Sequence, residues 1–194
     1  MFHTFFRLQA KLSTLQWVLI AAAALATNFV ATDFLNGAYA ASGFPVPYWE
    51  AQLSFDHEKL KGWYSFLLGK QALGRYLYAQ YVDFAFIGSV LVLHTSALLA
   101  VSRAFPPLSQ YRQAMIWAAL LSMIAPLADA VENAISFIML ANPTSFEPML
   151  ALAYSSVAAL KFAMFTFAYV AAGGGLIAAT VFWVARRKRS SSAA

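Results

Sequence analysis

The chain contains four apolar stretches, each about as long as a helix must be to cross the hydrocarbon core of a bilayer. That core is about 30 Å thick, which takes roughly 20 helical residues at 1.5 Å each. The stretches cover about residues 15–35, 77–101, 115–140 and 155–185. The chain is 61% hydrophobic and 11% charged, whereas soluble domains have roughly 45–50% and about 25%. The sequence therefore predicts an all-α integral membrane four-helix bundle that forms one domain over residues 1–194.

The composition excludes several classes of function. The absence of cysteine excludes disulfides, thiolate metal ligands and cysteine nucleophiles. No phosphate-binding loop, GxSxG or HExxH pattern is present, and His57 diverges from its neighbours Asp56 and Glu58 if the segment is helical. We therefore expect no metal and no cofactor. The net charge of +5 does not indicate a nucleic-acid partner, because four cations lie together at 186–189, directly after an apolar run, as is typical of a membrane-edge anchor.

Charges between the stretches predict the orientation of the chain. One side carries eight cations, which are Arg7, Lys11, Arg103, Arg112 and the run Arg186-Arg187-Lys188-Arg189. The other side carries Lys59, Lys61, Lys70 and Arg75, diluted by Glu50, Asp56, Glu58 and Glu147. Because basic residues favour the cytoplasmic face, both termini are predicted to be cytoplasmic. Residues 186–194 then form a basic cytoplasmic tail, and residues 36–76 form a long outside loop.

A cleaved signal peptide is an alternative interpretation of the first stretch. Arg7 and Lys11, the alanine-rich core and Ala38-Tyr39-Ala40 imitate the three regions of such a peptide. The apolar stretch is long for that role, and Asp33 lies where the approach to a cleavage site should be uncharged. We therefore favour a spanning helix.

The outside loop has two parts with different patterns. Residues 44–49, Phe-Pro-Val-Pro-Tyr-Trp, are stiff and aromatic, which suits a lip at the head-group level. Residues 53–81 have helical periodicity, with aromatic residues among lysines. This pattern predicts an amphipathic helix along the outer interface, or else an ordinary connector without ligand contact.

The fourth stretch is longer than one crossing needs. It either projects beyond the bilayer, tilts strongly, or bends at Gly173-Gly174-Gly175. The glycines are equally suited to close contact between helices.

Every stretch carries an ionisable residue at a similar distance from its cytoplasmic end. These residues are Asp33, Asp83, Asp129, Glu132 and Lys161. Helical rise places them about 24 to 38 Å along their helices, so they are predicted to share one layer near the outer head groups. A charge costs roughly 2.5–3.5 kcal/mol at the centre of a membrane helix, so several charges together are expected to face inward and pair.

Helical spacing collects polar residues on one face of three stretches. The third stretch has Ser122, Pro126, Asp129, Asn133 and Ser136, with Glu132 beside them. The second has Tyr76, Gln80, Asp83, Val90 and His94, and the fourth has Tyr154, Ala158, Lys161 and Phe165. Carboxylates outnumber cations in this layer, and like charges held close cannot all ionise. At least one of Asp83, Asp129 and Glu132 is expected to stay protonated, ready to exchange a proton or bind a cationic head group.

Several segments together resemble a family of four-span bacterial inner-membrane proteins. They are PVPYWEAQLSFD from Pro45 to Asp56, YVDF from Tyr81 to Phe84, DAVENAISF from Asp129 to Phe137, and Lys161-Phe162. The resemblance implies the four-span architecture and a bacterial inner-membrane location. The family has no assigned activity, so the resemblance implies no reaction.

The sequence leaves three functional hypotheses. In the first, the polar layer forms a pocket for a lipid-like amphiphile such as a phospholipid, isoprenoid or quinone. Its predicted ligand-binding residues are Asp33, Asp83, Asp129, Glu132, Asn133, Tyr154 and Lys161. In the second, the pocket modifies a lipid or isoprenoid, with Asp129, Glu132 and Asp83 as candidate catalytic groups. In the third, the chain is an accessory or assembly subunit with protein partners in the membrane, and Lys161 pairs with Glu132 or Asp129 only to fix helix packing.

Overall fold

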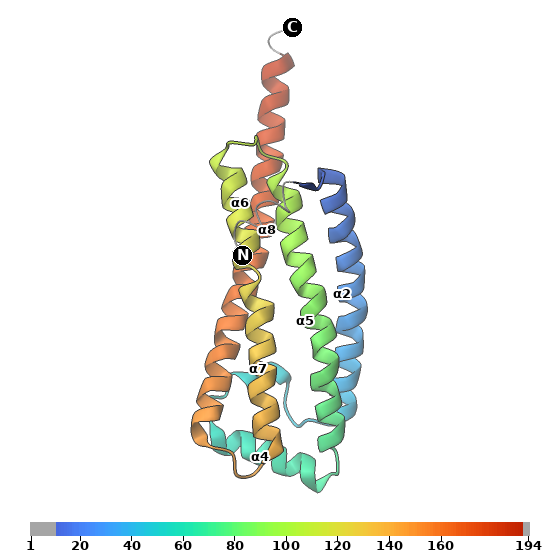
Figure 1. Ribbon diagram of the computed structural model, residues 1–194, viewed down its shortest axis with the longest axis vertical. Helices are drawn as coiled ribbons and strands as arrows, with labels where there is room; N and C mark the ends of the chain where they lie inside the picture. Colours follow the sequence, from blue (N-terminus) through green and yellow to red (C-terminus); the bar gives the residue numbers. More distant parts are fainter. Residues whose placement is uncertain (1–10, 192–194) are drawn as a thin grey trace.

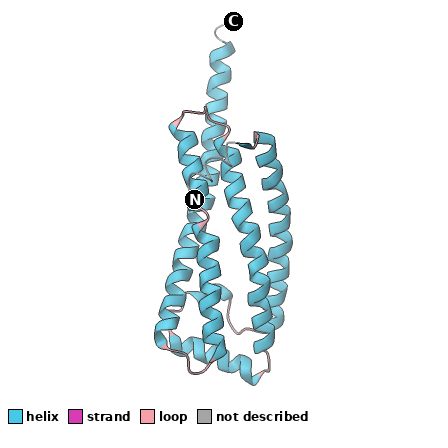
Figure 2. Cartoon of the chain, in the orientation of Figure 1, coloured by secondary structure: helices cyan, strands magenta, loops and turns pink. Residues whose placement is uncertain are grey.

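The fold is given by a computed structural model that describes residues 11–191. Within that range every regular element is an α-helix (Figure 2). The helices are α2 (Thr14–Ser42), α3 (Tyr48–Gln52), α4 (His57–Gly69), α5 (Leu73–Ser102), α6 (Gln110–Leu121), α7 (Ile124–Ala141) and α8 (Pro148–Ser191). Three features of the orientation prediction lie outside the described residues, namely Arg7, the side chain of Arg189 and residues 192–194.

The described chain has four helical segments long and apolar enough to cross a membrane. They are Thr14–Ser42, Leu73–Ser102, Gln110–Ala141 and Pro148–Lys188. The predictions of an all-α fold and of four long apolar helices are confirmed. The predicted segments were too short at several ends, because helices continue into residues that were assigned to loops.

Helices extend into both ends of the predicted loop of residues 36–76. Residues 36–42 complete α2, and residues 73–76 begin α5. A capping box between Ser13 and Gln16 begins α2. The helix ends at Gly43, whose φ of 65° lies in the left-handed region that glycine adopts readily. Gly43 is therefore the residue that ends the helix, and the alanine-rich residues before it stay helical.

The third apolar stretch consists of two helices placed end to end. The helix breaks at Ser122 and Met123, between α6 and α7. Pro126 lies four residues after Ser122, and proline has no N–H to donate to that carbonyl. At the break the Met123 N–H donates to Leu120, and the Ser122 hydroxyl donates to the carbonyl oxygen of Ala119 at 2.9 Å. The predicted span of residues 115–140 falls within Gln110–Ala141, one membrane-length segment that this short turn interrupts.

The long helices are arranged around α5 (Figure 1). α2 packs almost entirely on α5, while α6, α7 and α8 lie together on the other side of it. Contact between α2 and α8 is at most marginal. α3 and α4 lie at one end of the bundle, which we call the α4 end, and the C-terminal part of α8 projects alone from the opposite end, which we call the tail end (Figure 1).

The α4 end has an aromatic core. Leu60, Tyr64 and Leu67 of α4 are completely buried, and Phe44 stacks on Tyr76 with ring centroids 4.7 Å apart. The apolar face of α4 therefore packs against the protein. The helical pattern predicted over residues 53–81 is divided between α4 and α5 by a turn at Lys70–Ala72, in which Gln71 has a φ of 51°.

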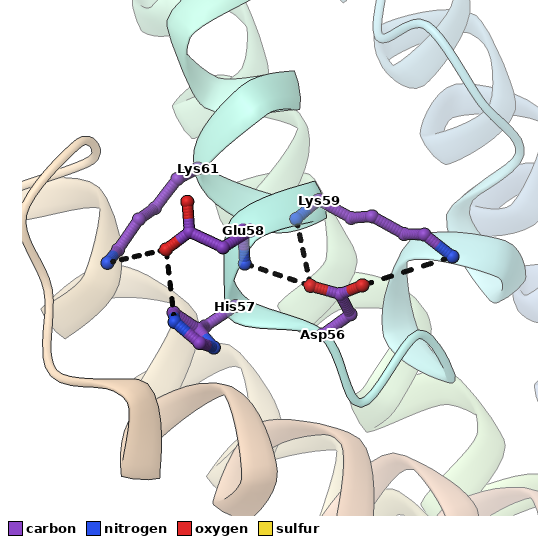
Figure 3. Close-up of polar contacts among 5 residues, drawn as sticks. All are labelled: Asp56, His57, Glu58, Lys59 and Lys61. Atoms are coloured by element: carbon purple, nitrogen blue, oxygen red, sulfur yellow. Dashed lines mark hydrogen bonds and ion pairs between the residues drawn. The ribbon is translucent and has the colours of Figure 1, made fainter.

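The first turn of α4 is held by charged side chains at the surface (Figure 3). The Asp56 carboxylate caps the helix, because it accepts from the backbone N–H groups of Glu58 at 3.0 Å and Lys59 at 3.1 Å. Glu58 turns the other way, toward His57 and Lys61 (Figure 3). The two carboxylates flanking His57 therefore serve the helix and its surface ion pairs.

The tail end is packed with small residues. Leu98, Leu99, Ile116, Ala118 and Ala119 form its buried cluster. α8 continues as one helix through Gly173, Gly174 and Gly175. A Cβ on Gly175 would lie 2.6 Å from the Met115 sulfur and 3.0 Å from a Val101 methyl, whereas the other two glycines face open space. α8 projects beyond the other helices and makes close helix contact at Gly175.

Candidate functional site

A cavity of about 370 Å³ lies near the α4 end, between α2, α5, α7 and α8 and beside α3. It is lined by Thr32, Leu35, Asn36, Tyr39, Tyr48, Gln52, Tyr76, Ala79, Gln80, Asp83, Phe86, Asp129, Asn133, Tyr154, Lys161, Phe162, Phe165, Thr166 and Tyr169. Mostly apolar and aromatic walls with a few converging polar groups are typical of small-molecule sites. This cavity is therefore the candidate site.

One part of the cavity wall is a buried ion group that joins α7 to α8. Lys161 Nζ lies 3.0 Å from Asp129 Oδ1 and is also ion-paired with Glu132 Oε2. The exposed fractions are 3% for Lys161, 2% for Asp129 and 0% for Glu132. Buried charges require such partners, because an unpaired ion loses its hydration without compensation. The single ammonium is thus shared by two carboxyl groups.

Asp83 is the carboxyl group of the cavity without a basic partner among the described residues. It lies on α5 and accepts a hydrogen bond of 2.6 Å from Asn133 Nδ2 of α7. Asp83 is half-buried and lines the cavity. Its carboxylate therefore keeps acceptor capacity beyond the bond to Asn133.

Two glutamines add acceptors to the same wall. Gln52 of α3 and Gln80 of α5 are each 8% exposed, and the side-chain carbonyl oxygen of each has no hydrogen-bond partner among the described residues. Both residues line the cavity. Buried polar atoms normally find partners, and these two oxygens lie within the wall with almost no surface open to the cavity.

Aromatic rings form most of the remaining surface. Tyr39 of α2 lies edge-on to Tyr48 and Tyr76, with ring centroids 5.9 and 6.1 Å apart. Its hydroxyl donates to the carbonyl oxygen of Val46 at 2.9 Å, which ties α2 to the segment before α3. The residues of the predicted lip therefore help to close the cavity.

α2 and α8 both contribute exposed residues to the cavity lining. Asn36 lines it from α2, and Thr166 and Tyr169 line it from α8. Tyr48 of α3 is a further exposed lining residue. The two long helices barely touch each other, so contact between them does not close the cavity.

The structure brings most of the predicted ligand-binding residues together. Those that line the cavity are Asp83, Asp129, Asn133, Tyr154 and Lys161. Glu132 lies behind this wall and reaches the site through its ion pair with Lys161. Of the three candidate catalytic groups, Asp83 and Asp129 thus reach the cavity surface.

Asp33 does not join the other predicted residues. It is exposed on α2 and is not among the residues that line the cavity. The α2 face toward the cavity carries Thr32, Leu35, Asn36 and Tyr39, a spacing of three or four residues. The prediction for Asp33 matched its depth along the helix, and the helix turns the side chain outward.

Sequence reasoning missed Tyr39 and Gln52 as lining residues, and Gln80 was placed on the polar stripe without a role. Gln80 could have been found because it lies three residues before Asp83 on one helical face. Gln52 gave no such signal, because its place depends on how the loop before α4 folds back.

Within residues 11–191, no group of three or more His, Asp or Glu side chains is arranged to hold a metal ion. His94 packs edge-on against Phe165 and Tyr169, with ring centroids 5.8 and 5.0 Å away.

Comparisons with protein-family models, curated proteins and solved structures find no match to this chain.

Proposed function

We propose that this chain is an integral membrane protein of the bacterial inner membrane that binds a lipid-like amphiphile in the cavity near the α4 end. The observation that carries the proposal is the lining of the cavity. Carboxyl and amide groups line it together with apolar and aromatic side chains. Exposed lining residues lie on α2 and α8, two membrane-length helices that barely touch. A head group would lie at Asp83 and Asn133, and its alkyl chain would leave between α2 and α8.

The orientation of the bundle is part of this proposal. Arg103 and Arg112 flank the loop between α5 and α6, Lys11 precedes α2, and Arg186 to Lys188 lie in the tail. The positive-inside rule favours a cytoplasmic position for these residues. The cavity would then lie in the outer half of the membrane, and both termini would be cytoplasmic.

Native mass spectrometry of the gently extracted protein tests the proposal. Thr166→Trp places a large side chain at the mouth of the cavity. Thr180→Trp is the matched control, because both threonines are exposed on α8 and donate to the carbonyl four residues earlier. We expect one stoichiometric amphiphile on the wild type and on Thr180→Trp, and its loss from Thr166→Trp. Equal loading of all three proteins, or a bare wild type, would contradict the proposal.

An accessory or assembly subunit is the second proposal, and a different observation favours it. The C-terminal part of α8 projects beyond the other helices (Figure 1), and the ion group of Lys161, Asp129 and Glu132 ties α7 to α8 as a packing layer would. In that case the wild type would carry no stoichiometric amphiphile. It would be extracted from the membrane together with a partner protein, and the amount of bound partner would fall when residues 180–191 are removed.

A further inference from the structure

The charges around the cavity leave one acceptor group without a counter-charge. Lys161 is the single basic residue among the described residues that line the cavity, and it is already paired with Asp129 and Glu132. α2 and α3 contribute no ionised side chain to the lining, since Asp33 faces outward. The Asp83 carboxylate therefore faces the cavity with only the amide of Asn133 as its partner.

The free acceptor positions of Asp83 favour a guest that donates. The Asp83 carboxyl group lines the cavity and accepts one hydrogen bond, from Asn133. A carboxylate left without further donors in a partly buried site costs free energy, and a guest with several N–H groups removes that cost. A carboxylate, unlike an amide, has only acceptor atoms, so Asp83 sets the sign of the charge that fits.

The rest of the described lining offers no charge that would hold an anion. Most of it is apolar or aromatic, including Phe86, Phe165 and Tyr169. An anionic head group would meet Asp83 and Asp129 with no uncommitted cation among the described lining residues. Fatty acids and other anionic head groups are therefore disfavoured.

We propose that the cavity selects amphiphiles whose head group carries a primary ammonium, held by Asp83. This inference rests on the proposed function and names its ligand class. A free long-chain amine and a phospholipid with an ethanolamine head share the ammonium group with its three N–H donors, and the phospholipid carries a phosphate beside it, which the amine lacks.

Three amphiphiles of equal chain length separate the contribution of the head group to binding from that of the alkyl chain. Dodecylamine, dodecanol and dodecanoic acid are titrated calorimetrically into the full chain in an uncharged maltoside detergent near neutral pH. We expect dodecylamine to bind at least about tenfold tighter than the other two, the effect of one charge-assisted hydrogen bond network. A comparison of lysophosphatidylethanolamine with lysophosphatidylcholine then distinguishes the two sources of the ammonium group. Tighter binding of the ethanolamine lipid identifies a phospholipid, and its failure to bind identifies a free amine.

The variant Asp83→Asn tests the role of the charge. It keeps the side-chain shape and should weaken dodecylamine binding about tenfold or more, a larger factor than for dodecanol, which has no charge to lose. Asp33→Asn is the matched control, because Asp33 is an exposed aspartate that lies outside the cavity lining, and it should change neither. If Asp83→Asn does not fold, the wild type is titrated with dodecyltrimethylammonium, which has the charge without N–H donors and should bind about tenfold more weakly than dodecylamine.

The outcomes distinguish this inference from the proposed function. Equal binding of amine, alcohol and acid would overturn the ammonium selectivity and leave an amphiphile site. Equal effects of Asp83→Asn and Asp33→Asn on amine binding would also overturn it, because the selectivity would then come from surface charge. No binding of any amphiphile would overturn both.

Discussion

The α4 end and the tail end of the bundle are built from the same kind of long apolar helix, and they pack in different ways. At the tail end, Gly175 of α8 lies so close to Met115 and Val101 that a methyl group has no room. Near the α4 end, α8 instead presents Phe162, Phe165 and Tyr169 to a cavity of about 370 Å³. Small residues allow helices to approach, whereas large rings hold them apart.

The polar residues follow the same division. Among the described residues, the charged ones on the inner faces of the long helices lie toward the α4 end, and they are Asp83, Asp129, Glu132 and Lys161. The buried cluster of the tail end consists of Leu98, Leu99, Ile116 and alanines. A loosely filled space next to buried charge is expensive to maintain for packing alone. The tail end is therefore where the helices associate closely, and the α4 end is where the cavity and the buried charges lie together.

The largest expected effect comes from removing the cation that the α4 end depends on. Lys161→Met leaves Asp129 and Glu132 buried without their shared partner, which should cost about 3–5 kcal/mol of stability. Equilibrium unfolding in mixed SDS and maltoside micelles measures the change. Lys59→Met is the control, because its side chain is 65% exposed, and its loss should cost less than about 0.5 kcal/mol.

A second substitution shows whether the loss comes from charge or from packing. Lys161→Met combined with Glu132→Gln removes one of the two unpaired carboxyl groups and should recover a substantial part of the lost stability. If the double variant is as unstable as Lys161→Met, the ion group is not what distinguishes the α4 end.

The next largest effect is expected at the tail end. Gly175→Leu forces a side chain against Met115 and Val101, and overpacking of this kind typically costs about 1–3 kcal/mol. Gly174→Leu introduces the same residue where no atom lies within 4 Å of the added Cβ, and it should be nearly neutral. Thermal unfolding by circular dichroism compares the two, and equal losses would mean that the tail end is not closely packed at Gly175.

The sequence predicted where the helices lie, and the direction of side chains around them only in part. Hydropathy located the four helices, and helical spacing correctly turned Asp129, Asn133 and Lys161 inward. Asp33 faces outward, because the inner face of α2 carries Asn28, Thr32 and Asn36 at a spacing of four residues. That spacing does not include Asp33, and matching charges by distance along the helix overlooked it.

The cavity itself could not be predicted from the sequence. It exists because α2 packs on α5 and barely touches α8, and because the loop before α4 brings Tyr48 and Gln52 over the space. Both depend on tertiary contacts between distant segments. The burial of Leu60, Tyr64 and Leu67 was missed for the same reason, since amphipathic spacing shows that a face is apolar without showing what covers it.

Helix capping provides a comparison in which the two ends should behave alike. Asp56 caps α4 at the α4 end, and Ser109 caps α6 at the tail end by accepting from Arg112 N–H at 3.2 Å. Asp56→Ala and Ser109→Ala should each cost about 1 kcal/mol, because a cap acts on its own first turn. Chemical denaturation measures both. A loss at Asp56 several times larger would show that docking of α4 depends on the cap, and the ends would then differ in local structure too.

The smallest expected effect is a loss of stability at alkaline pH, which only the α4 end should show. Burial raises the pKa of Tyr64, in α4, above its ordinary value near 10. The folded chain therefore keeps a proton that the unfolded chain releases. This contribution to stability is complete below pH 10 and declines as the pH rises from there toward the pKa of the folded state. Stability should fall by less than about 1 kcal/mol from this group at pH 10.5.

Tyr64→Phe removes the proton and should flatten the decline in stability between pH 10 and 11, measured as the change in unfolding midpoint relative to that at pH 8. Tyr111→Phe, at a tyrosine of the tail end that is 63% exposed, should leave the alkaline curve as it is in the wild type. The comparison at matched pH cancels any change in packing that the lost hydroxyl causes at every pH. If both variants shift the curve equally, burial at α4 is not its cause, and the aromatic core of the α4 end is more open to solvent than its packing indicates.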